Sequence, residues 1–145
     1  TRATLAAARA AFPGRVAVVF QPHLYSRTRD LLEEFSRAFG VADIVLIAPI
    51  YGARELPMPG VDHHLLAGRI AARLPGTPVL APASLEEAVR ILSQAATGSL
   101  EGEHADSVPS LQNGDVIITV GAGNVDSVAQ ALVNTCRTCG GEERI

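Results

Sequence analysis

The chain has 145 residues, 48% of them hydrophobic and 19% charged, which is long and apolar enough to bury the core of one domain. A formal net charge of −3 and the lack of a basic cluster argue against nucleic acid as a partner. No apolar run approaches the roughly 18 residues that span a bilayer, and no signal-peptide pattern opens the chain, so the sequence predicts a cytoplasmic protein without a membrane partner.

Two elements are predicted before the first polar segment. Residues 2–12 form an Ala-rich helix, which Pro13-Gly14 ends. The buried face of this helix is expected to carry Leu5, Ala8 and Phe12. Residues 15–20 contain the run Val-Ala-Val-Val-Phe, which is apolar on both faces and therefore typical of a buried parallel strand.

The same order of elements then repeats. Ser26 is the predicted N-cap of a helix with apolar residues at helical spacing up to Phe39. A strand over residues 43–48 and a Pro/Gly-rich loop over residues 49–61 follow. Asp62 is predicted to cap a helix whose apolar positions are Leu66, Ile70 and Leu74.

The next unit begins with a short strand at residues 77–80. Ser84 and Glu87 form a capping box that opens a helix. The buried positions of this helix are expected to be Leu85, Ala88 and Leu92. Residues 97–113 are polar and without periodicity, which predicts a flexible loop.

The final unit carries the clearest pattern. Residues 116–120 are a predicted strand that leads through a tight turn at residues 121–124 into a helix with Val125 and Val128 on its apolar stripe. Repeated strand–helix units imply an α/β fold: a Rossmann-like, mostly parallel sheet with helices on both faces, a three-layer sandwich. We expect one domain over residues 1–145.

Ligands of open α/β sheets bind beyond the carboxyl ends of the strands, and polar residues follow the first strand at this place. These residues are His23, Tyr25, Ser26 and Arg27. The N-terminus of a helix favours an anion, Arg27 would clamp a carboxylate, and His23 would share one hydrogen bond with it. The alternative is that Ser26 is only a cap, His23 a loop histidine and Arg27 a solvated charge.

A second candidate is the turn between the last strand and the last helix. It consists of Gly121, Ala122, Gly123 and Asn124. Such a turn lets the backbone approach a ligand, or it is needed only for packing. Asp126 replaces the third glycine of the dinucleotide motif, which argues against an NAD-dependent enzyme. Tyr51 and Glu55 follow the second strand and either line the same site or belong to a Pro-stabilised loop.

Other motifs of catalysis are missing from the sequence. It contains no GxxxxGK[ST] phosphate loop, no GxSxG elbow and no cluster of metal ligands. Cys136 and Cys139 form a lone CxxC, which is a weak zinc signal, and we expect two terminal thiols without a metal. All 12 basic residues are Arg, so any side-chain cation that holds an anion must be an Arg.

Three segments resemble the UDP-N-acetylmuramate–L-alanine ligases, a family of Mur ligases. Residues 18–29 closely resemble the FQPH-x-YSRT motif of that family, residues 51–57 its YxAxExP loop, and residues 115–124 its GDxxxxxGAGN ending. The segments occur in the family's order and spread over almost the whole chain. They correspond to the C-terminal third of the family.

This resemblance implies a C-terminal domain that presents an amino acid, with the N-terminal UDP-sugar domain and the central ATPase domain outside the chain. The complete enzyme would use ATP and Mg²⁺, none of it bound by this domain alone, to activate UDP-N-acetylmuramate as an acyl phosphate that L-alanine attacks. No catalytic residue is expected here. The residues implied in L-alanine binding are His23, Tyr25, Ser26, Arg27, Gly121, Ala122, Gly123 and Asn124, with Tyr51 and Glu55 as further lining.

Two departures from the family pattern are visible. Leu24 stands where many members carry Arg, so a second carboxylate contact is absent or supplied elsewhere, and the loop at residues 97–113 is longer than usual. The alternative function is a free-standing Rossmann-like module that binds a small ligand without catalysis through the same residues. A phosphate loop upstream of this segment would decide for the ligase.

Overall fold

A single parallel sheet organises the molecule, for which a computed structural model describes residues 1–139. The strand order is β3-β2-β1-β4. Strand β1 (Val16–Gln21) pairs with β2 (Ile44–Ile47) and β4 (Val116–Gly121), and β3 (Val79–Leu80) lies beyond β2. Every pairing between these strands is parallel, which confirms the predicted sheet.

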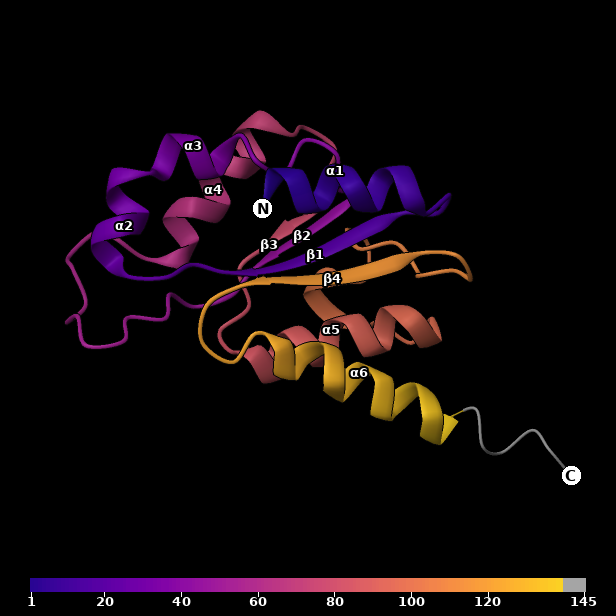
Figure 1. Ribbon diagram of the computed structural model, residues 1–145. Helices are drawn as coiled ribbons and strands as arrows, with labels where there is room; N and C mark the ends of the chain where they lie inside the picture. Colours follow the sequence, from indigo (N-terminus) through magenta and orange to yellow (C-terminus); the bar gives the residue numbers. More distant parts are fainter. Residues whose placement is uncertain (140–145) are drawn as a thin grey trace, which may run out of the picture.

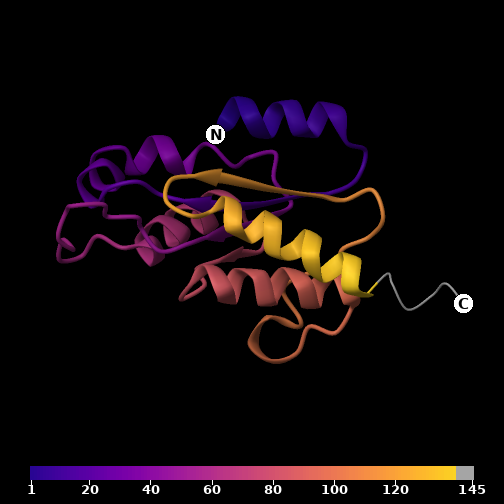
Figure 2. The same ribbon diagram turned by 60° about the horizontal axis from the view of Figure 1, so that its bottom comes forward.

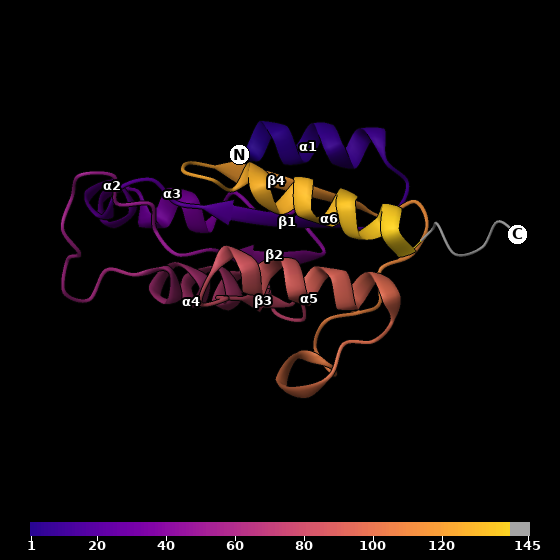
Figure 3. The ribbon, with the colours of Figure 1, turned by 90° about the horizontal axis from the view of Figure 1, so that it is seen from below.

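Helices cover both faces of the sheet, as Figure 1 shows. Helices α1 (Arg2–Ala11), α3 (Leu32–Ser36) and α4 (His63–Arg73) lie on one face. Helices α5 (Leu85–Thr97) and α6 (Asp126–Cys139) lie side by side on the other, as the views in Figure 2 and Figure 3 confirm. Helix α2 (Tyr25–Asp30) sits beyond the carboxyl end of β1. The three-layer α/β prediction is therefore confirmed.

The central strand explains the two cores. All six residues of β1 are buried. Val16, Val18 and Phe20 pack against the layer of α1 and α4, whereas Ala17 and Val19 pack against the layer of α5 and α6. A strand covered on both faces must be apolar at every position, and this is what the run at residues 16–20 provides.

Two helix starts follow the predicted chemistry. The Asp62 carboxylate accepts a hydrogen bond from the Leu65 amide at 2.8 Å, and the Ser84 hydroxyl accepts one from the Glu87 amide at 3.1 Å. The Glu87 carboxylate accepts in turn from the amide of Ala83 at 2.6 Å, one residue before the usual capping-box position. Both N-caps are confirmed.

Replacing Ser84 with alanine should therefore lower the free energy of unfolding by about 1 kcal/mol, because the amide of Glu87 loses its acceptor at the start of α5. Urea unfolding followed by circular dichroism measures the change. The exposed Ser110 provides a control, since Ser110→Ala should shift stability by less than about 0.5 kcal/mol. Equal losses in both variants would contradict the capping role.

Three local predictions are wrong. Phe12 is 45% exposed and follows α1 in an extended conformation, because Pro13 disfavours helical backbone in the residue before it. Ser26 is not an N-cap but lies inside α2, for which Leu24 stands at the N-cap position. The helix expected to run towards Phe39 is broken at Leu31 into α2 and α3.

The segment at residues 97–113 contains little regular structure but is tied to the fold. It holds the short 3₁₀ helix η1 (Gly102–His104), and the amide of Leu111 donates to the carbonyl of Ala95 at 2.9 Å. Val108 is buried in the core beneath α5. Cys136 is exposed, and the side chain of Cys139 lies outside the described residues. No helix of the described part of the chain is long and apolar enough to cross a membrane.

Candidate functional site

The segments after β1 and β2 meet beyond the edge of the sheet. The amide of Tyr51 donates to the carbonyl of Pro22 at 2.8 Å, and the amide of Leu24 donates to the carbonyl of Tyr51 at 2.9 Å. These bonds form an isolated parallel bridge between His23 and Tyr51. Two of the three motif segments therefore lie together at the carboxyl ends of the strands.

His23 and Tyr51 also stack through their rings, whose centroids are 5.9 Å apart with an interplanar angle of 20°. Both side chains are exposed. The turn after β4 approaches the same ring, since a Cβ atom built on Gly123 would lie 2.9 Å from Cδ2 of Tyr51. Tyr51 thus joins the second motif segment to both of the others.

Gly121 and Gly123 lie close to β1. A Cβ atom on Gly121, whose φ is +134°, would lie 2.1 Å from the carbonyl oxygen of Gln21, and one on Gly123 would lie 2.8 Å from Oε1 of Gln21. The amide of Ala122 donates to that same carbonyl of Gln21 at 3.0 Å. Close packing of the turn, one of the two alternatives that the sequence left open, therefore accounts for both glycines.

Gln21 is a residue of this region that the sequence reasoning did not select. It is 8% exposed, and its Nε2 donates to the carbonyl of Pro49 at 3.1 Å. Its Oε1 is buried and has no hydrogen-bond partner among residues 1–139. A polar side chain at the end of an otherwise apolar strand was the signal available in the sequence. Its position shows that it connects the loop after β2 with the turn after β4.

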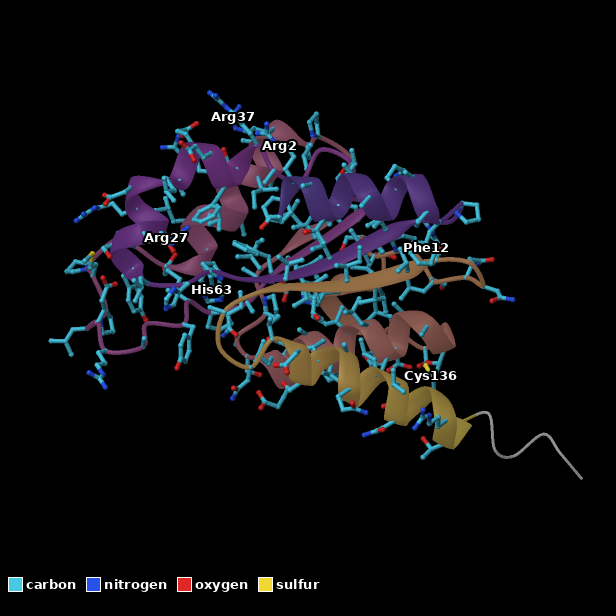
Figure 4. All side chains as sticks on the ribbon, viewed as in Figure 1. Arg2, Phe12, Arg27, Arg37, His63 and Cys136 are labelled. Carbon is cyan, nitrogen blue, oxygen red and sulfur yellow. The ribbon has the colours of Figure 1, made fainter. Side chains whose placement is uncertain are left out.

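A hollow of about 180 Å³ brings several predicted residues together. Its walls include His23, Arg27, Gly121 and Ala122, next to Gln21. Arg27 projects from α2 (Figure 4) and is exposed. None of the ion pairs between the described residues includes Arg27, so its guanidinium is available to an anion.

The remaining predicted residues lie around this hollow without lining it. The ring of Tyr25 packs against Gly52, where a Cβ atom would lie 2.7 Å from Cε2 of the ring. Asn124 is exposed before α6, and its carbonyl accepts from the amide of Ser127 at 2.9 Å. A larger hollow of about 440 Å³ lies between β4 and α6 and contains none of the predicted residues.

The beginning of α2 is occupied by a carboxylate of the protein itself. Oε2 of Glu55 accepts from the amide of Ser26 at 3.0 Å, and Oε1 accepts from the Ser26 hydroxyl. These hydrogen bonds, from the hydroxyl first and then from the amide, lower the pKa of Glu55 below its ordinary value, and the charge of Arg29 acts in the same direction. The amide and the hydroxyl of Ser26 are therefore already paired within the chain, whereas the sequence had predicted an external anion at this helix end.

This arrangement makes the titration of Glu55 a direct test of the contact. Carbon-detected NMR should give Glu55 a pKa below its ordinary value, and Ser26→Ala should raise this pKa, because the hydroxyl donor is lost. Since the folded-state pKa is lowered, the contact stabilises the fold above the ordinary pKa and loses this contribution as the pH falls through the folded value. An unchanged pKa in Ser26→Ala would contradict the contact.

Comparison with known proteins gives a consistent result, although no family model matches the chain. The chain is 39% identical over 140 residues to a UDP-N-acetylmuramate–L-alanine ligase of Sorangium cellulosum, covering 90% of this chain and 25% of that protein. The ligase of Symbiobacterium thermophilum is 40% identical over 138 residues, which cover 94% of this chain and 25% of that protein. The ligase of Methylibium petroleiphilum is 42% identical over 132 residues, which cover 90% of this chain and 25% of that protein.

The chain thus spans about a quarter of the length of the curated relatives that it matches. At least 90% of this chain is covered in each of these comparisons. The described residues form one α/β layer structure around a four-stranded sheet. The chain is therefore homologous to a single domain of the UDP-N-acetylmuramate–L-alanine ligases.

Proposed function

We propose that this chain is the C-terminal, amino-acid-presenting domain of an ATP-dependent UDP-N-acetylmuramate–L-alanine ligase, which acts in the cytoplasm in peptidoglycan precursor synthesis. The observation that carries the proposal is the hollow of about 180 Å³, where His23 and Arg27 of one motif meet Gly121 and Ala122 of another. Homology to one domain of such ligases supports it.

In this proposal Arg27 binds the carboxylate of L-alanine. A guanidinium forms two parallel hydrogen bonds with a carboxylate, and Arg27 has no competing ion pair among the described residues. His23, on the same wall, contributes a further hydrogen bond. With the carboxylate fixed, the amine of L-alanine is oriented towards the acyl phosphate of UDP-N-acetylmuramate on the rest of the enzyme.

The contribution of the domain to the rate is then proximity and orientation, which supply about 7–11 kcal/mol in ideal cases. Closure over the acyl phosphate would also keep water away from a hydrolysable intermediate. The proposal assigns ATP and Mg²⁺ to the three quarters of the relatives' length outside this chain. The chain has no phosphate loop, and its described residues contain no group of three His, Cys, Asp or Glu side chains that could hold a metal.

The other predicted contacts take supporting roles in the proposal. Tyr25 and Ser26 hold the start of α2 through Gly52 and Glu55. Gly123 and Asn124 complete the turn behind the hollow, and Tyr51 packs against His23. Only His23, Arg27 and the backbone of Gly121 and Ala122 would touch the amino acid.

Titration of the isotope-labelled chain with L-alanine tests the proposal. Saturable shifts of the amide signals of His23, Arg27 and Ala122 are the expected result, and ethylamine, which lacks the carboxylate, should produce none. L-Alanine shifts confined to other regions, or equal shifts with ethylamine, would overturn the assignment of the site.

The ligase part of the proposal is tested on the native gene product, by its intact mass and by ADP release. We expect a longer protein with a phosphate loop whose ADP release requires both UDP-N-acetylmuramate and L-alanine. The 145-residue chain alone should release no ADP. A native product without a phosphate loop that still binds L-alanine would instead be a binding module without catalysis.

A further inference from the structure

We propose that Glu55 is a positioning residue of the amino-acid site: its carboxylate caps α2 and so fixes the direction of Arg27, without touching the ligand. The inference rests on the proposed function, because it assumes that Arg27 binds a carboxylate. Its basis is the pair of hydrogen bonds that connects Glu55 with Ser26, the residue before Arg27.

Helix α2 needs a cap from elsewhere in the chain. It has six residues, and the side chain of its N-cap residue, Leu24, accepts no hydrogen bond from the helix. The first N–H groups of a helix have no acceptor within the helix, and so short a helix is not stable by itself. Glu55, 29 residues further along the chain, supplies acceptors for the amide and the hydroxyl of Ser26.

The backbone before α2 also requires support. Leu24 has φ +63° and ψ +138°, a conformation that a residue with a side chain adopts only when its surroundings hold it there. Its amide is bound by the carbonyl of Tyr51 at 2.9 Å, and Tyr25 packs on Gly52. The loop from Tyr51 to Glu55 therefore contacts three successive residues at the start of α2, which are Leu24, Tyr25 and Ser26. The contact between Glu55 and Ser26 is the charged one.

Arg27 depends on this support because it makes no ion pair among the described residues. Its direction is set by the helix that carries it. Glu55 itself does not belong to the walls of the hollow, and each of its carboxylate oxygens already accepts from Ser26. A role through Arg27 fits these contacts better than a direct contact with the ligand, because Glu55 lies outside the walls of the hollow and is bound to Ser26.

Two ligands separate the positioning role from a direct contact. L-Alanine carries a carboxylate and an ammonium group, whereas acetate carries only the carboxylate. Glu55→Ala should weaken both by the same factor, about tenfold, which is the expected cost of one charge-assisted hydrogen bond. Glu55→Gln keeps an acceptor oxygen for Ser26 and should lose about threefold or less for both ligands. Exposed Glu101 gives the control, and Glu101→Ala should bind both ligands like the wild type.

The coupling to Arg27 is measured in a double variant. In an Arg27→Ala background, Glu55→Ala should cause no further loss, because the two changes act through one contact. Amide dispersion in the NMR spectra shows whether each variant folds. If Glu55→Ala does not fold, Glu55→Gln takes its place. The positioning role would be overturned if Glu55→Ala lost L-alanine binding but kept normal acetate binding, or if it bound both ligands like the wild type. Additive losses in the double variant would overturn it as well. A wild-type chain that binds neither ligand would instead refute the proposed function, and this inference with it.

Discussion

Replacing Arg27 with alanine is expected to raise the dissociation constant for L-alanine about ten- to a hundredfold. A charge-assisted hydrogen-bond pair contributes about 1.5–3 kcal/mol, and Arg27 lines the hollow without an ion pair of its own among the described residues. The fold should lose little stability, because the side chain is exposed and makes no ion pair among the described residues. NMR titration of the chain measures the affinity, and thermal unfolding measures the stability.

Two further variants sharpen this prediction. Arg27→Lys keeps the positive charge but not the planar pair of donors, so most of the affinity should still be lost. Exposed Arg37, which follows α3 (Figure 4), provides a matched removal of one charge, and Arg37→Ala should leave L-alanine binding unchanged. If Arg27→Ala and Arg37→Ala lost the same affinity for L-alanine, the effect would come from the overall charge of the domain and not from a contact of Arg27.

The sheet could be predicted because its signals are local in the sequence. Each buried parallel strand must be apolar on both faces, and the runs at residues 16–20 and 44–47 satisfy this rule without knowledge of their neighbours. The caps at Asp62 and Ser84 also lie within three residues of the amides that they bind. Contacts of this range leave a pattern that sequence reasoning can read.

The start of α2 could not be predicted by the same reasoning. Ser26 precedes a helical pattern and has the right side chain for a local cap, so local rules select it. The structure places it inside the helix because a carboxylate 29 residues away, on Glu55, supplies the acceptor. A contact between two loops depends on the pairing of β1 with β2, which becomes visible only once the sheet is assembled.

The convergence of the motif segments could be predicted from the sequence, whereas the contacts that each residue makes there could not. Motif residues at the ends of parallel strands had to converge, and His23, Arg27, Gly121 and Ala122 do share one hollow. Sequence spacing does not say which of them face the hollow and which support it. The role of Gln21 was missed because its neighbours, Pro49 and Gly123, come from two distant segments.

The turn after β4 leads to the prediction with the largest effect on stability. Gly121→Ala should lower the free energy of unfolding by about 4 kcal/mol or more, since it combines backbone strain with a collision in a packed region. The φ of Gly121 is +134°, and an added Cβ would lie 2.1 Å from the carbonyl oxygen of Gln21. That oxygen accepts from Ala122 and belongs to the central strand, so it cannot move aside without disturbing the pairing of β1 with β4.

Gly60 separates the two causes, because its φ is +75° and nothing lies within 4 Å of the position of an added Cβ. Gly60→Ala should cost only about 1 kcal/mol, the strain of a positive φ without a collision. Urea unfolding of both variants measures the difference, and a Gly121 variant that yields no folded protein falls on the expected side. If Gly121→Ala costs no more than Gly60→Ala, the turn does not approach β1 as closely as described. Gly121 and Ala122 would then lie further from Arg27 than described. The hollow would no longer be lined by both motif segments, and the proposed amino-acid site would be incomplete.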